Sequence, residues 1–391
     1  MKAPSTDFSA ERLPPAGVAL PSASRPTAAL INLAALEHNF KEVTRHIEGR
    51  RILAVVKAQA YGHGSVPVSR HLLGLGANML GVALIEEGQE LRACGINAPI
   101  LVMGPLFPKQ AESVVAFHLT PVVYSVPFAR AVSQAALRLK TKIAVHVKID
   151  TGMGRIGIPP EEALAFILEL RNLDGIELQG LMTHFADADL ADKEFASKQM
   201  DRFNNLVQEL DTRRISIPFR HAANSAAILD FKRALFTMVR PGLMLYGYNP
   251  LEKGQERTVL KPALSLVTRI AFLKKTPAGS PISYGRTFVT RRESLIATLP
   301  IGYADGFNRE LSNKGEGLVR GKRVPVVGRV CMDMCMIDVT EVPGVTEGDA
   351  VVLIGEQAGQ HITADDIAEK TGTISYEVLC GISTRVPRIY L

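Results

Sequence analysis

The amino-acid sequence predicts an α/β protein in which a (β/α)8 barrel is followed by a β-rich C-terminal domain. From about residue 50 to about residue 240, eight short apolar runs alternate with helix-like segments, as in a barrel of parallel strands. After residue 262 the long helical patterns stop, and strand-like runs are separated by Gly, Pro and Asp turns. The 391 residues are enough for a barrel of roughly 250 residues and a smaller second domain.

The eight predicted barrel strands are rich in Val, Ile, Leu and Met, which is typical of strands that are buried on both faces. They are Ile52–Val56, Met79–Leu84, Ile100–Met103, Pro121–Tyr124, Ile143–Ile149, Leu178–Thr183, Phe219–Ala222 and Thr237–Val239. Between them, PPEEALAFILELR begins with prolines and acids, which are signals for a helix N-terminus. We therefore favour a TIM-type barrel over its competitor, an open doubly wound sheet, although one sequence does not fix the number of units.

The predicted domains are a barrel at residues 26–262 and a β-rich domain at residues 263–391, preceded by a flexible tail at residues 1–25. The sequence leaves open whether the first strand belongs to the barrel or joins the C-terminal domain. The tail is rich in Pro, Ala and Ser and lacks an uninterrupted apolar segment, so we interpret it as a tail rather than a secretion signal. A cytoplasmic location is the resulting expectation.

The composition excludes several classes of function. Hydrophobic residues make up 47% and charged residues 21%, which is typical of a globular protein. The net charge is +6, but the basic residues are dispersed and predict no nucleic-acid surface. No apolar stretch approaches the ~20 residues of a membrane span. The four cysteines form no C-x-x-C pair, so we expect reduced thiols and no metal site.

A lysine follows the first predicted barrel strand in AVVKAQAYGHG, which runs from Ala54 to Gly64. Lys57 either reaches water or is held in a pocket as a Schiff-base amine. Chemistry in a barrel belongs at the C-terminal ends of the strands. Several other polar or small residues map to these ends: Lys148, Arg155, His184, Asn224, Ser225, Arg240 and Gly242. Each alone is more often structural, but their shared position indicates a site.

A phosphate group is the ligand that the last two strand ends predict. The loops after strands seven and eight often hold a phosphate in this fold, where Ser225 offers a hydroxyl and Gly242 allows close approach of the backbone. Tyr61 adds a phenol. A phosphate site near a strand-end lysine indicates pyridoxal 5'-phosphate (PLP), whose aldehyde condenses with a lysine amine.

A competing motif is TGMGRIG, from Thr151 to Gly157, which contains G-x-G-x-x-G and would indicate a dinucleotide-binding dehydrogenase. The following helix is predicted to begin at Pro159–Pro160, after the third glycine. In a dinucleotide site the helix begins within the glycine motif, so that its N–H groups face the pyrophosphate. The dehydrogenase interpretation is therefore disfavoured.

The sequence from about Arg25 to Leu391 resembles the alanine racemases, PLP-dependent enzymes of fold type III. The resemblance rests on AVVKAQAYGHG together with eight further motifs that occur in the family's order. They are KIDTGMGRIG, MTHFADAD, HAANSAA, VRPGLMLYG, ISYGRTF, LPIGYADG, GRVCMDM and SYEVLCGIS with the later RVPR. The family architecture is a PLP-binding barrel followed by a β domain, which agrees with the prediction from the sequence pattern.

The resemblance implies a two-base mechanism. Lys57 would bond the cofactor and act as one base, and Tyr284 would be the other base on the opposite face. Racemisation needs this arrangement, because one group removes the α-proton and another returns it from the far side. His184 would hydrogen-bond Tyr284. Arg240 would support His184 and face the pyridine nitrogen, where other PLP enzymes generally carry an acid.

The resemblance also implies the binding residues. The phosphate contacts would come from Tyr61, Ser225, Gly242 and Tyr376. Arg155, Met332, Asp333 and Tyr303 would contact or admit the substrate. Lys148 matches a position that is often carbamylated, with an ordinary lysine as the alternative. Tyr284, Met332 and Tyr303 would reach the active site of the other subunit, which implies a homodimer. Gln59 departs from the family, which commonly has asparagine there.

The function that we predict is the reversible interconversion of L-alanine and D-alanine, which would supply D-alanine for bacterial peptidoglycan. A racemase of broad specificity, or one that prefers serine, is the nearest alternative, since pockets distinguish one methylene by only ~1–3 kcal/mol. A non-catalytic PLP carrier is an alternative of a different class, but such proteins resemble the barrel alone.

Overall fold

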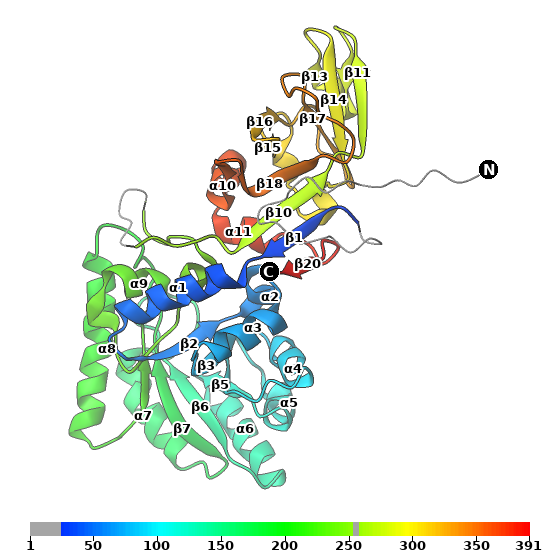
Figure 1. Cartoon of the computed structure of the whole chain (residues 1–391). Helices are drawn as coiled ribbons and strands as arrows, with labels where there is room; N and C mark the ends of the chain where they lie inside the picture. The colour runs from blue at the N-terminus through cyan, green and yellow to red at the C-terminus, as the bar shows by residue number, and fades with distance from the viewer. Residues whose placement is uncertain (1–24, 253–257) are drawn as a thin grey trace. The chain divides into compact units, whose positions relative to one another are not determined.

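The computed structural model describes residues 25–252 and 258–391 (Figure 1). The chain divides into two compact units: one runs from Ala34 to Lys261, and the other combines the chain up to Leu33 with Pro262–Leu391. Apart from Arg25, the tail predicted at residues 1–25 lies outside the described residues. Among the described residues, none of the helices has the length and apolar character required to cross a membrane.

The first unit contains an eight-stranded parallel sheet. Its strands are β2 (Arg51–Val55), β3 (Met79–Val82), β4 (Ile100–Val102), β5 (Thr120–Val123), β6 (Ile143–Lys148), β7 (Ile176–Met182), β8 (Phe219–His221) and β9 (Met238–Val239), in the order β8-β7-β6-β5-β4-β3-β2-β9. The two ends of this series meet, because Thr237 N–H donates to the carbonyl of Arg220 (3.1 Å) and Arg240 N–H to that of Ala223 (2.9 Å). The predicted barrel is thus confirmed, and the open sheet is wrong.

Helices connect the strands of this unit, and Figure 1 shows α6 and α8 on the outside of the strands. The α-helices are α1 (Leu33–His46), α2 (Lys57–Tyr61), α3 (Ser65–Gly74), α4 (Ile85–Ala93), α5 (Ala111–Ala116), α6 (Val126–Arg138), α7 (Pro160–Arg171), α8 (Glu194–Thr212) and α9 (Ser225–Asp230). Short 3-10 turns are η1 (Pro108–Gln110), η2 (Lys232–Ala234) and η3 (Leu243–Tyr246). On α8 the buried residues Met200, Phe203 and Leu210 recur at helical spacing and face the core. As predicted, α7 begins after the third glycine of TGMGRIG.

The second unit is built from β-sheets. A seven-stranded sheet contains β16 (Lys322–Pro325), β15 (Glu316–Val319), β18 (Ala350–Gln357), β10 (Leu264–Arg269), β1 (Ala28–Ile31) and β20 (Arg388–Tyr390) in that order, with β19 (Gln360–Ile362) on β18. A three-stranded sheet contains β11 (Phe272–Thr276), β14 (Ser294–Leu299) and β17 (Cys335–Asp338). The pair β12 (Pro281–Ile282) and β13 (Phe288–Val289) is separate.

Short helical segments complete the second unit: α10 (Ala364–Thr371), α11 (Ser375–Cys380), η4 (Tyr284–Arg286), η5 (Tyr303–Asp305) and η6 (Arg309–Leu311). The first strand of the described chain belongs to this unit, because β1 pairs antiparallel with β10 and parallel with β20. The buried side chains of Ile282, Ile296 and Val327 form a cluster beneath Phe288 and Met336. This cluster fixes the base of the hairpin that carries Tyr284 at its tip.

Candidate active site

Lys57 begins a short left-handed turn directly after β2. Ala58, Gln59, Ala60 and Tyr61 all have φ between 52° and 54°. For residues with a Cβ this conformation costs roughly 1–2 kcal/mol each, so four in succession persist only if neighbouring groups hold them. The turn ends at Gly62, with φ 83°, where a positive φ carries no such penalty. The turn places the Tyr61 ring beside Gly242, which follows the last barrel strand.

The turn brings Tyr61 together with Ser225 and Gly242, the residues predicted to bind phosphate. The buried ring of Tyr61 stacks on Tyr246, with 4.8 Å between the centroids. A Cβ on Gly242 would lie 2.6 Å from the phenol oxygen of Tyr61, so only glycine fits there. Ser225 Oγ accepts hydrogen bonds from the N–H groups of Gly242 (2.9 Å) and Met244 (3.4 Å). Its own hydrogen therefore points away from these donors and is available to an anion.

The same cradle lies beside the strand that carries Lys57. Val55, two residues before Lys57, donates its N–H to the carbonyl of Pro241 at 3.0 Å, next to Gly242. Asn224 caps α9 by accepting from Ala227 N–H at 3.0 Å, which fixes Ser225 as the first residue of that helix. The residues predicted to lie at the ends of the first, seventh and eighth strands are therefore neighbours.

Arg240 is a buried hub that connects three strand ends. Its guanidinium donates to the carbonyls of Thr183 (2.8 Å), His221 (2.8 Å) and Ala222 (2.9 Å). Burial lowers the pKa of Arg240 to about 9, which leaves the side chain charged at neutral pH. No carboxylate pairs with it among the described residues; the compensation comes from carbonyl oxygens. The charge is thus held in place by the backbone at the C-terminal end of the barrel.

Arg240 also fixes the tautomers of the histidines around it. Its two Nη atoms lie 3.2 Å from His184 Nδ1 and 3.1 Å from His221 Nδ1. Because arginine only donates, both Nδ1 atoms accept, and both rings carry their hydrogen on Nε2. His221 Nε2 lies 2.9 Å from His146 Nδ1 and donates to it. Burial and the nearby positive charges keep the pKa of His184 and of His221 well below the ordinary value, so both rings are neutral.

Lys148 is buried at the end of β6 without an ion pair among the described residues. Burial, followed by the positive charges of Arg240 and Arg155, holds the pKa of Lys148 well below its ordinary value. A neutral lysine amine is a nucleophile. Arg155, in the loop after this strand, is exposed.

The glycine motif after β6 does not form an anion site. The N–H groups of Gly152 (3.0 Å) and Gly154 (3.1 Å) both donate to Asp150 Oδ1. These are the groups that a dinucleotide pyrophosphate would need, and a carboxylate of the chain already uses them. The dehydrogenase interpretation of TGMGRIG therefore finds no support in the geometry.

In the second unit, Tyr303 and Met332 are held side by side by backbone hydrogen bonds. Tyr303 N–H donates to the carbonyl of Cys331, and Ala304 N–H to that of Met332, each at 3.0 Å. Gly302 allows this approach, because a Cβ there would lie 2.2 Å from the Cys331 oxygen. Both side chains are exposed, Tyr303 to 42% and Met332 to 53%.

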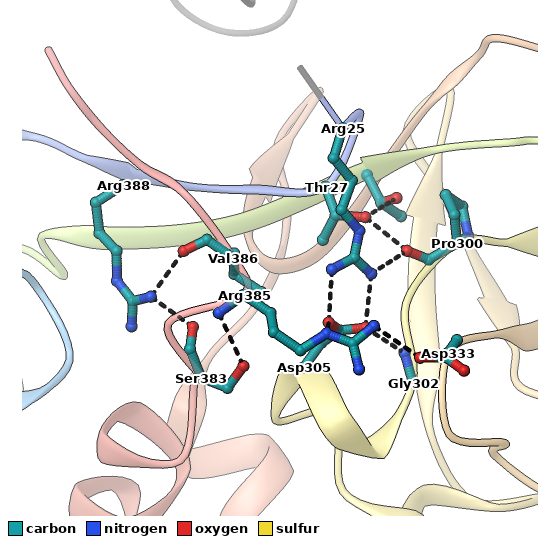
Figure 2. Close-up of polar contacts among 11 residues, drawn as sticks. Arg25, Thr27, Pro300, Gly302, Asp305, Asp333, Ser383, Arg385, Val386 and Arg388 are labelled. Carbon is teal, nitrogen blue, oxygen red and sulfur yellow. Dashed lines mark hydrogen bonds and ion pairs between the residues drawn. The ribbon is translucent and has the colours of Figure 1, made fainter.

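A buried carboxylate anchors this surface, as Figure 2 shows. Asp305 is fully buried and accepts from both Nη atoms of Arg25, each at 2.6 Å, and from Gly302 N–H at 3.0 Å. Arg385 lies 3.3 Å from Asp305 and donates to Asp333 at 2.7 Å. Burial alone would raise the pKa of Asp305, but the hydrogen bonds from Arg25 and Gly302 outweigh it and lower the pKa. One carboxylate thus connects the start of the described chain to the Tyr303 and Asp333 loops.

Tyr284 lies at the tip of the β12–β13 hairpin and is 71% exposed. The flanking Ser283 and Arg286 have φ of 66° and 51°, and Ser283 Oγ donates to the carbonyl of Arg329 at 2.7 Å. Strained backbone of this kind is often found at functional sites, which favours a binding role for the turn. Tyr376 lies in α11.

Several residues of the site were missed from the sequence. His146 and His221 lie within apolar runs that were predicted correctly as buried strands, and a histidine in such a run was the available signal. The hydrogen bond from Ala58 N–H to Glu87 on α4 has no comparable signal, because the two residues lie 29 positions apart in the sequence. In the second unit, the contact of Arg25 with Asp305 has none either, because these residues lie 280 positions apart. Among the described residues, no group of three or more His, Cys, Asp or Glu side chains could hold a metal ion.

Both domains of the chain match sequence models of one protein family. The sequence model for the N-terminal domain of alanine racemase matches residues 31–250, and that for the C-terminal domain matches residues 263–390. The chain belongs to the alanine racemase family. An alanine racemase of Halothermothrix orenii is 50% identical over 368 residues, which cover 94% of this chain and 97% of that protein. Alanine racemase 2 of Caldanaerobacter subterraneus is 49% identical, with coverage of 94% and 95%.

Solved alanine racemase structures agree with this family. That of Clostridium difficile superposes with a TM-score of 0.90 at 41% identity, covering 94% of this chain and 96% of that one. The Bacillus anthracis enzyme with bound L-Ala-P gives a TM-score of 0.88 at 39% identity, with coverage of 94% and 95%. The family resemblance predicted from the sequence motifs is confirmed, and both domains of the family are present in this chain.

Proposed function

We propose that this protein is a PLP-dependent isomerase that interconverts L-alanine and D-alanine through Lys57 and Tyr284. The observation that carries the proposal is the joint position of Lys57, the Tyr61–Ser225–Gly242 cradle and the charged Arg240 at the C-terminal strand ends of one barrel. The family supplies the reaction, and this geometry supports its assignment to these residues.

The residues present fit PLP. The Ser225 hydroxyl, the Tyr61 phenol and the space at Gly242 suit a phosphate, with Tyr376 as a further proposed contact. When bound, PLP supplies an aldehyde that condenses with amines and a conjugated ring that accepts electrons from the α-carbon. Arg240 cannot readily release a proton. A ring nitrogen bound against Arg240 would therefore stay unprotonated. The ring would then withdraw electrons more weakly, which would disfavour side reactions and suit simple proton transfer.

Two bases move the α-proton in the proposed mechanism. The Lys57 amine holds or returns the proton on one face, and the Tyr284 phenolate does so on the other. A free tyrosine loses its proton only near pH 10, so Tyr284 needs help to act as a base. His184 is suited to this task, because Arg240 occupies its Nδ1 and leaves Nε2–H as a donor. A hydrogen bond to the charged form favours that form.

The second base would come from a partner copy of the chain, which makes a homodimer part of the proposal. Tyr284, Tyr303 and Met332 are large, exposed side chains of the second unit, to 71%, 42% and 53%. Tyr303 and Met332 are also neighbours, and adjacent exposed apolar side chains favour a protein contact. In the proposed dimer, Met332 and Asp333 contact the substrate carboxylate and Tyr303 lines the entrance.

Arg155 is the proposed carboxylate ligand within the barrel, and Lys148 the proposed carbamate that orients it. Carbamylation joins the neutral lysine nitrogen to CO2 with loss of one proton, and so converts a neutral buried amine into an anion. The low pKa of Lys148 favours the neutral amine that this step needs. An anion at this position would offset the positive charges of Arg155 and Arg240.

The biological role that we propose is the supply of D-alanine for the peptidoglycan of a bacterial cell wall. None of the four cysteines, all of which lie in the described part of the chain, forms a disulfide. This favours the proposed cytoplasmic location, since cytosolic proteins keep their thiols reduced.

The reaction is tested by proton NMR in D2O with PLP and, in separate samples, L-alanine, L-serine or L-lysine. Loss of the α-proton signal together with D-alanine on chiral chromatography is the expected result, with little change in the other two amino acids. Exchange without D-product would discard two-base racemisation. Exchange with L-serine at least as fast as with L-alanine would move the assignment to a racemase of different specificity.

Mixed dimers test both the bases and the shared site. Lys57→Ala should lose the visible absorbance of the bound cofactor, whereas Tyr284→Phe should keep it and lose racemisation by about 10²- to 10⁴-fold. Co-expression of the two variants should restore about a quarter of the activity, because half of the dimers are mixed and each has one intact site. Each variant alone is the control. No recovery in isolated mixed dimers would contradict a shared site.

A further inference from the structure

We infer that Glu87 is a positioning residue for Lys57, acting through the backbone of Ala58. This inference rests on the proposed role of Lys57 and adds a residue on α4 to it. Glu87 Oε1 accepts the N–H of Ala58 at 2.6 Å, immediately after Lys57. Glu87 Oε2 accepts the N–H groups of Ala83 (2.7 Å) and Leu84 (3.0 Å). One carboxylate therefore holds three backbone donors.

The Glu87 carboxylate joins the segments after β2 and β3 at a point where the two strands have ended. The last backbone bond that joins the chain after β2 to β3 runs from Val56 N–H to the carbonyl of Gly81 at 2.8 Å. Beyond Val56 and Gly81 the two segments diverge, and Ala58 and Ala83 do not form a backbone hydrogen bond with each other. The Glu87 carboxylate spans the gap between them. It thus ties the residue after Lys57 to the neighbouring strand end.

The left-handed turn explains why such a tie is needed. Ala58, Gln59 and Ala60 all have φ near 52–54°, a conformation that residues with a Cβ avoid. Gln59 supplies a second restraint, since its Nε2 donates to Glu90 at 2.8 Å and its Oε1 accepts from Ser65 Oγ at 3.2 Å. The asparagine common in the family is one methylene shorter. The glutamine of this chain reaches from the turn to α4.

A carboxylate is required because the three donors approach both of its oxygens. A glutamine has one acceptor oxygen and one NH2 group. If its oxygen faces Ala83 and Leu84, its NH2 group faces the N–H of Ala58, and that hydrogen bond is lost. Glu87→Gln therefore keeps the size of the side chain and the cap of α4 while it removes the tie to the Lys57 turn.

The experiment titrates PLP into the cofactor-free full-length protein and follows fluorescence quenching and the visible absorbance of the lysine-bound cofactor. Glu87→Gln should weaken PLP binding by about five- to tenfold, the range expected for one charge-assisted hydrogen bond. Glu86→Gln is the matched control, because Glu86 lies exposed on the same turn of α4 and makes none of these contacts. It should bind PLP as the parent protein does.

A rescue distinguishes positioning from a general loss of stability. Ala58→Gly removes the penalty of the left-handed conformation at the residue that Glu87 holds. In the Glu87→Gln background it should restore PLP affinity to within about twofold of the parent, a recovery that a merely structural role would not show. Unchanged PLP affinity in Glu87→Gln overturns the inference, and so does a loss that Ala58→Gly leaves as it was.

Two further readouts keep the inference separate from the proposed function. If the parent protein does not bind PLP through Lys57, as borohydride reduction and peptide mass would show, the proposed function itself fails. If Glu87→Gln does not fold, amide hydrogen exchange of the parent protein decides. The N–H of Ala58 should be protected although the residue is exposed, and rapid exchange there would overturn the inference.

Discussion

At the scale of single residues, the site depends on where each hydrogen atom resides. Arginine donates and never accepts, so Arg240 leaves His184 with its hydrogen on Nε2. The positions of some site residues could be predicted from the sequence. Lys57, Ser225, Arg240 and Gly242 could be placed at strand ends by counting apolar runs. The pairing of His221 with Arg240 and His146 could not, because it depends on which side chains point inward in neighbouring strands.

Lys148 gives the prediction that belongs to this scale. Its buried amine should take up CO2, because burial and the nearby positive charges lower its pKa and so favour the neutral form that reacts. In solutions of ¹³C-enriched bicarbonate, carbon NMR should show a protein-bound carbamate signal. Lys148→Arg is the control and should lack the signal, since it keeps a long side chain but replaces the nucleophilic amine by a protonated guanidinium. A spectrum without a bound carbamate in the parent protein would leave Lys148 as an ordinary lysine.

At the scale of elements, the strands follow from composition, but the irregularities between them do not. The register of β6 and β7 shifts between Val145 and His146. At this shift the ring of His146 lies against Gly180, where a Cβ would be 2.3 Å from the ring. An apolar run with one histidine predicts a buried strand. The run contains no signal for the register shift. The shift arises because the His146 ring occupies the space that a side chain at position 180 would fill, and glycine leaves this space open.

Gly180→Ala tests this packing. The added methyl should force the His146 ring and one strand apart and lower the free energy of unfolding by about 1–3 kcal/mol, as overpacking in a core does. Gly74→Ala is the matched control: it lies at the end of α3 with open space around it and should be neutral or slightly stabilising. Urea unfolding of both variants measures the difference. Equal stabilities would show that the ring yields without strain.

At the scale of the whole molecule, the β-rich domain could be predicted from the sequence, whereas the pairing of strands far apart in the chain could not. The change of pattern after residue 262 predicted a β-rich domain, and the family match at residues 263–390 agrees with it. The position of β1 could not be deduced, because its partners β10 and β20 lie more than two hundred residues away along the chain. Its pairing brings Arg25 to the buried carboxylate of Asp305, a contact without any local sequence signal.

The buried histidines make the stability of the whole barrel depend on pH. Burial first, and then the charge of Arg240, lower the pKa of His146 to about 3, and the pKa values of His184 and His221 are also well below 6.5. The unfolded chain takes up protons near pH 6.5, whereas the folded chain does not. The stabilisation is therefore complete above pH 6.5 and is lost as the pH falls from 6.5 toward 3.

Urea unfolding of the cofactor-free protein between pH 8 and pH 5 measures this loss. Each neutral histidine should contribute a slope of up to about 1.4 kcal/mol per pH unit below its unfolded pKa. His146→Gln should lower the slope by about one such contribution, because its amide oxygen still accepts from His221 Nε2 but takes up no proton. The two proteins are compared at pH 8 to separate packing from protonation. An unchanged slope in the variant would mean that His146 is charged in the folded protein.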